Sequence, residues 1–105
     1  MQVATRDYRE GLDERLADRD YAASYLDACL QEGDLKGMLI ALGDVARVHG
    51  GISSLADLTE LNRPSLYKIL SDQGNPTIES LDKILRVFGL RLAITEERDE
   101  EPVAA

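Results

Sequence analysis

The chain has 105 residues, 44% of them hydrophobic, and a formal net charge of −8, which suits one domain able to fold without disulfides or a metal. Its single cysteine, Cys29, excludes an intramolecular disulfide and a cysteine-based zinc site. With no signal peptide and no apolar run long enough to cross a membrane, we expect a cytoplasmic protein that needs no cofactor.

The first third of the chain predicts two helices. Thr5 can cap the first, which carries one narrow apolar stripe of Tyr8, Leu12 and Leu16. Asp20 can cap the second, and Gly33 can end it in the left-handed conformation. We interpret residues 1–33 as an N-terminal helical extension of the same domain.

Residues 34–59 predict two more helices. Asp34 can cap a helix with the strongest 3.6-residue periodicity in the chain, which ends at residues 49–51. Ser53 or Ser54 can cap the next helix, which reaches Thr59.

The following stretch predicts two short helices separated by a loop. After a turn at residues 60–62, Asn62 can cap a helix that tolerates Pro64 in its first turn. Residues 72–76 form a loop by composition, and Thr77 can cap a last helix that ends at Gly89.

The end of the chain predicts one strand and a disordered tail. Residues 90–94, Leu-Arg-Leu-Ala-Ile, alternate with period two. A lone strand leaves its backbone groups unpaired, so the segment must pair across a dimer axis, receive a strand from a partner protein, or not form, and of these we expect Leu90, Leu92 and Ile94 to pair across a dimer axis. Residues 96–105 are acidic and predicted to be disordered.

Residues 54–70 meet the requirements of a helix–turn–helix, in which the second helix enters the major groove of DNA. Five apolar residues can form a shared inner face: Leu55, Leu58, Leu61, Leu66 and Ile69. Arg63, Ser65, Tyr67 and Lys68 then point outward, where their side chains can reach bases or phosphates. The expected helix N-termini at Ser53/Ser54 and at Thr77, with Asn75 beside the latter, offer free amides for phosphates.

The net charge argues against DNA binding, but its distribution does not. Residues 34–95 contain seven acidic and seven basic residues, so this part is neutral. Residues 1–33 contain eight acidic and four basic residues, and residues 96–105 contain five and one. The whole acidic excess therefore lies outside the segment that carries the predicted motif.

The blocks LADLTELNRPSLYKILS, GNPT and GLRLAI, with the preceding RDYAASYLDACLQEGDLKGMLIALGDVARVHGG, resemble the Xre/Cro-like repressors. They are most similar to the addiction-module antidote branch, the HigA-like antitoxins, over residues 5–95. The resemblance implies an all-α fold, a five-helix bundle with a lambda-repressor-like helix–turn–helix and a short C-terminal β-strand. The helix–turn–helix domain with its closing strand would span residues 34–95.

The resemblance also implies a function. It implies an antitoxin that neutralises a RelE/ParE-like toxin and represses its own operon as a homodimer on operator DNA. By motif position, Arg63, Ser65, Tyr67 and Lys68 would contact bases or nearby phosphates, and Ser53, Ser54, Asn75 and Thr77 would contact phosphates. Many relatives carry Ser-Arg-Glu-like residues at positions 62–64, where this chain has Asn-Arg-Pro, so the base preference does not transfer.

Two other readings stay open: a protein-interaction module that no longer reads DNA, and a stand-alone Xre-type regulator. We expect no enzyme, because His49, the single histidine, has no serine or cysteine nucleophile spaced around it. We expect Cys29 to be a small core residue, and we predict no catalytic residue and no metal ligand. The acidic N-terminal helices are the expected contact for a basic toxin.

Overall fold

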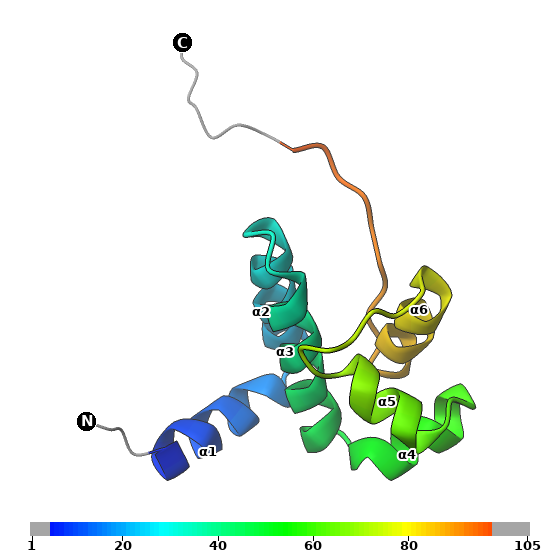
Figure 1. Cartoon of the computed structure of the whole chain (residues 1–105). Coiled ribbons are helices and arrows are strands. Elements are labelled where there is room, and N and C mark those ends of the chain that lie inside the picture. Colours follow the sequence, from blue (N-terminus) through cyan, green and yellow to red (C-terminus); the bar gives the residue numbers. More distant parts are fainter. Residues whose placement is uncertain (1–4, 98–105) are drawn as a thin grey trace.

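A computed structural model describes residues 5–97, and within them the chain forms six helices (Figure 1). In chain order these are α1 (Thr5–Leu16), α2 (Arg19–Gln31), α3 (Leu35–Val48), α4 (Gly51–Thr59), α5 (Arg63–Ile69) and α6 (Ile78–Val87). The described part is all-α, as predicted. The six helices predicted along the chain are present, whereas the five-helix bundle implied by the resemblance has one helix too few.

The first helix contributes two residues of its predicted apolar stripe to the core. Leu12 and Leu16 of α1 are buried, and α1 packs against both α2 and α3. The largest fully buried side chains come from five different helices: Leu16, Leu42, Val45, Leu55, Leu66 and Ile84. One apolar core therefore joins the N-terminal extension to the helices that follow it.

Three of the predicted N-caps are confirmed, and each follows from local chemistry. The side chains of Asp34, Asn62 and Thr77 accept hydrogen bonds from backbone amides three residues later, at 2.9, 2.8 and 3.0 Å. An N-cap oxygen satisfies an amide that has no partner inside the helix. Gly33 follows the end of α2 with positive φ, as predicted, and Gly89, where the last helix was expected to end, also has positive φ.

Two predicted helix starts are wrong. Asp18 caps α2 by accepting from the amide of Asp20 at 3.0 Å, and Asp20 lies in the first helical turn, where its charge suits the helix dipole. Helix α4 begins at Gly51 rather than at Ser53 or Ser54, and no side chain caps it. Its N-cap Gly50 has φ 112°, a conformation that glycine adopts without steric cost.

The predicted C-terminal strand is absent from the described residues. Residues 90–97 have no regular secondary structure and follow α6 as an extended segment (Figure 1). Leu90 donates its amide to the carbonyl of Leu85 at 2.9 Å, and residues 91–97 make no backbone hydrogen bond with the described chain. A strand forms only against another strand, and the described part of a single copy supplies none. Most of the tail predicted to be disordered lies outside the described residues.

Candidate functional site

Helices α4 and α5 are held at their corner by a buried threonine. Thr59 donates its Oγ1 hydrogen to the carbonyl of Leu55 at 2.7 Å, and the same oxygen accepts the amide of Leu61 at 3.2 Å. The next residue, Glu60, adopts a left-handed conformation with φ 66° and ends α4. One hydroxyl thus joins the last turn of α4 to the connection before α5.

The inner face of this helix pair differs from the predicted set at one position. Leu55 and Leu66 are buried, and Leu61 and Ile69 pack against the core as partly buried residues. Leu58 was expected beside them but is 65% exposed. Thr59, four residues after Leu55, takes the inward position instead, and sequence reasoning missed it because an isolated threonine carries no apolar signal.

The outer face of α5 carries the residues expected to contact DNA. Arg63, Ser65, Tyr67 and Lys68 are all exposed, and Tyr67 is 63% exposed despite its size. The amide of Ser65 is occupied by the Asn62 cap, whereas the Ser65 hydroxyl is exposed to solvent. Within residues 5–97, neither Arg63 nor Lys68 forms an ion pair. Both cationic groups are free to meet a ligand.

The four residues expected to contact phosphates differ in exposure and in how far their side chains are already hydrogen-bonded. Ser53 is exposed and Ser54 half-buried, and both lie inside α4 because that helix starts earlier than predicted. Asn75 is exposed in the loop before α6. Thr77 accepts the amide of Ser80 and donates to the Ser80 hydroxyl at 3.1 Å, so its side chain is largely used in capping.

The loop between α5 and α6 is anchored from two sides. Ser71 donates its hydroxyl to the carbonyl of Lys68 at 2.7 Å and accepts the amide of Gln73 at 3.1 Å. On the other side, Lys36 of α3 donates its ammonium to the carbonyl of Gly74 at 3.0 Å. These bonds set the position of Asn75 relative to α5.

Two arginines on other helices, Arg47 of α3 and Arg86 of α6, form ion pairs. Arg47 forms a two-point contact with Asp13 of α1, with both nitrogen–oxygen distances 2.9 Å, and it lies 3.4 Å from Asp44. The hydrogen bond to Asp13 raises the pKa of the Arg47 guanidinium, so this group stays charged and paired. Arg86 pairs with Asp82 at 3.2 Å. Arg63 and Lys68 therefore differ from Arg47 and Arg86 in having unpaired charge.

His49 and Cys29 have structural surroundings. His49 places Nε2 3.1 Å from the carbonyl oxygen of Leu16, and its ring lies 5.6 Å from that of Phe88, centroid to centroid. It thereby links the ends of α1, α3 and α6. Cys29 is half-buried against the core, and burial, followed by the charges of Asp34 and Glu32, raises the pKa of its thiol.

The expected dimer residues lie on the segment that follows α6. Leu90 and Leu92 are partly buried against the core, whereas Ile94 is 100% exposed. The period-two pattern that predicted a strand therefore matches the burial of Leu90 and Leu92 but not that of Ile94.

Comparison with known families decides the class of this protein. A model of the family described as "Probable addiction module antidote protein" matches residues 8–96, which includes all of α2 to α6. The chain belongs to this family. Membership in the antidote family supports an antitoxin role, with a toxin as the partner that the antidote acts against. The antidote part of the resemblance is thereby confirmed.

An uncharacterized protein of Haemophilus influenzae is a relative of this antidote-family chain. The two are 34% identical over 85 residues, which cover 81% of this chain and 87% of the relative. No solved structure matches the chain. Within the described residues, no helix is both long and apolar enough to span a membrane.

Proposed function

We propose that this chain is the antitoxin of a type II toxin–antitoxin module. It neutralises a RelE/ParE-like toxin and represses its own operon by binding operator DNA as a dimer. Membership in the antidote family supports the toxin partner. The observation that carries the DNA-binding part is the exposed, unpaired outer face of α5.

In this proposal α4, the connection 60–62 and α5 act as a helix–turn–helix. The Thr59 hydroxyl and the Asn62 cap hold the two helices in place, and Leu66 buries the inner side of α5. The opposite side then presents Arg63, Ser65, Tyr67 and Lys68 to the major groove. Arginine and lysine donate to guanine acceptors or phosphates, and hydroxyl groups bond to either.

Phosphate contacts would flank that helix. Ser53 lies in the first turn of α4, where backbone amides lack helical partners and the dipole favours an anion. Ser54 is half-buried in the next turn and contributes less. Asn75 is exposed on the anchored loop, and Thr77 offers its backbone at the start of α6 rather than its occupied hydroxyl.

The dimer follows from the symmetry of operators, since a two-fold DNA site requires two reading helices. Residues 91–97 have backbone groups without partners in the described chain, and the apolar side chains of Leu90, Leu92 and Ile94 alternate along the start of this segment. Antiparallel pairing of this segment between two copies satisfies those groups. No catalytic residue and no cofactor is part of the proposal.

A specific observation supports a second candidate, a protein-interaction module that no longer reads DNA. Asp57 of α4 and Glu60 at its end are both exposed close to the proposed reading helix in sequence, and carboxylates repel phosphates. A stand-alone regulator without a toxin is disfavoured by the antidote family.

A mobility-shift titration with the DNA upstream of the protein's own gene separates these candidates. The proposal expects binding that unlabelled copies of the same DNA displace at lower concentration than unrelated DNA does. The toxin-neutralising part of the proposal is tested by expressing the protein encoded beside the gene with and without this chain. The proposal expects this chain to relieve the growth arrest that the neighbouring protein causes. If unrelated DNA displaces the protein as well as its own upstream DNA does, while the chain still relieves growth arrest, the interaction module is favoured.

A further inference from the structure

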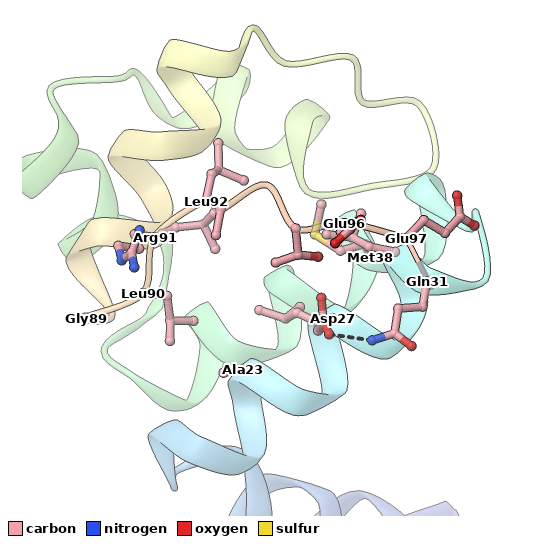
Figure 2. Close-up of a pocket in the computed structure, with 15 residues that line it drawn as sticks. Ala23, Asp27, Gln31, Met38, Gly89, Leu90, Arg91, Leu92, Glu96 and Glu97 are labelled. Carbon is pink, nitrogen blue, oxygen red and sulfur yellow. Dashed lines mark hydrogen bonds between the residues drawn. The ribbon is translucent and has the colours of Figure 1, made fainter. Parts of the chain in front are cut away.

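An open groove lies between α2 and the segment that follows α6, with a cavity volume of about 940 Å³ (Figure 2). Its apolar lining comes from three helices and the segment itself: Leu26, Leu30, Met38, Leu85, Leu90 and Leu92. Leu30 is 37% exposed and Leu90 and Leu92 are partly buried, whereas Leu26, Met38 and Leu85 belong to the buried core. Apolar surface of this kind is stabilised when a partner removes it from water.

The charged groups of the groove are mainly carboxylates. Asp27, Glu96 and Glu97 line it, against one cation, Arg91. Figure 2 shows Glu96 and Glu97 towards the end near Gln31 and Met38, whereas Arg91 lies towards the opposite end beside Gly89 and Leu90. Gln31 donates to Asp27 at 2.7 Å, and within residues 5–97 no cation pairs with any of the three carboxylates.

Three occupants can be compared by charge. The chain's own residues 98–105 contain Asp99, Glu100 and Glu101 against one arginine, so they would add carboxylates to an acidic groove. A second copy carries a net charge of −8 and brings the same three carboxylates. A cationic segment neutralises them, and complementary charge also speeds association.

We propose that this groove holds the toxin, through a segment of the toxin that carries lysine or arginine beside apolar side chains. The inference rests on the toxin partner of the proposed function. The three groove carboxylates that no described cation pairs with favour a cationic partner segment. The docking uses the side chains that line the groove, whereas the proposed dimer pairs the backbone of the segment that follows α6.

The test uses isothermal titration calorimetry of the full chain with the purified protein encoded beside its gene. The groove variant is Asp27→Lys/Glu96→Lys. The matched control, Asp57→Lys/Glu79→Lys, makes the same change in net charge at exposed positions on α4 and α6 that do not line the groove. All four residues are exposed, so both variants should fold, which circular dichroism checks.

We expect the groove variant to bind at least about tenfold more weakly, because reversed charges then face a cationic partner. The control should change affinity by about twofold or less, since salt screens distant charges. Equal affinities for both variants, or equal losses, would overturn the groove while leaving the antitoxin role intact. Absence of binding by the unaltered chain would contradict the antitoxin proposal itself. A shift in self-association confined to the groove variant, measured by sedimentation, would assign the groove to a second copy and overturn the inference.

Discussion

The ammonium of Lys36 donates a hydrogen bond to the carbonyl oxygen of Gly74 at 3.0 Å, although the two residues lie 38 positions apart. The bond is partly buried and joins the first turn of α3 to the loop that connects α5 to α6. That loop carries Asn75, and it is continuous with the proposed reading helix. The Lys36–Gly74 hydrogen bond therefore holds the loop beside the candidate DNA-binding surface against α3.

Replacing Lys36 with methionine should lower the free energy of unfolding by about 0.5–1.5 kcal/mol, since it removes one hydrogen bond to a partly buried carbonyl. Urea unfolding measures this change. Lys83→Met is the matched control, because Lys83 is exposed on α6 and makes no hydrogen bond within the described residues. Equal losses for the two variants would show that the Lys36 contact contributes nothing specific.

Gly74→Ala should lower the free energy of unfolding by about 1–3 kcal/mol or more. A Cβ at this buried position would lie against the backbone carbonyl of Ile69, which cannot move without displacing the end of α5. Gly11→Ala is the contrasting control, because among the side chains that the structure describes its Cβ meets only the flexible end of Arg15, at 3.4 Å. That variant should gain about 0.5–1 kcal/mol from the better helix propensity of alanine. Thermal unfolding that ranks the two variants in the opposite order would contradict the close approach at Gly74.

Thr59→Val should destabilise the protein by about 1–3 kcal/mol, because the Leu61 amide loses its acceptor and valine keeps the shape but not the hydroxyl. Thr59→Ser retains both hydrogen bonds and should lose less. Hydrogen exchange of the Leu61 amide provides a local readout, and it should become faster in Thr59→Val alone. An unchanged exchange rate would mean that the hydroxyl does not fix the α4–α5 corner.

The pKa of the Cys29 thiol is raised above its ordinary value of 9.0, first by burial and then by Asp34 and Glu32. The folded protein thus keeps this proton to higher pH than the unfolded chain does. Its contribution to stability is complete below pH 9.0 and is lost as the pH rises through the higher folded pKa. We expect alkylation by iodoacetamide at pH 8 to be slower for the native protein than in urea. We also expect Cys29→Ala to weaken the loss of stability above pH 9.0. Equal alkylation rates would contradict the raised pKa.

Local chemistry explains which parts of the fold were predictable from sequence. Asp34, Asn62 and Thr77 cap helices because each precedes a strongly periodic helix and a short polar side chain reaches an amide three residues on. The α2 cap was misplaced by two residues because Asp18 and Asp20 are both suitable caps in sequence. The α4 start was missed because positive φ at Gly50 leaves no side-chain signal.

The remaining differences depend on tertiary context. Thr59 rather than Leu58 lies inward, where its hydroxyl bonds the Leu55 carbonyl and the Leu61 amide, and apolar periodicity alone does not contain this polar contact. The strand at residues 90–94 needs backbone partners that no described part of this chain provides. The exposed set Arg63, Ser65, Tyr67 and Lys68 was predictable because a seven-residue helix with one buried leucine leaves few alternatives.

The central claim is that the outer face of α5 binds the protein's own operator. Fluorescence anisotropy of that DNA, titrated at several salt concentrations with the unaltered chain, Arg63→Ala/Lys68→Ala and Lys83→Ala, tests it most directly. The account predicts that the α5 variant binds at least about tenfold more weakly and that its salt slope falls by about 1–2, because up to two phosphate contacts are lost. Lys83→Ala should match the unaltered chain. Unchanged operator affinity and salt slope in the α5 variant would contradict the claim.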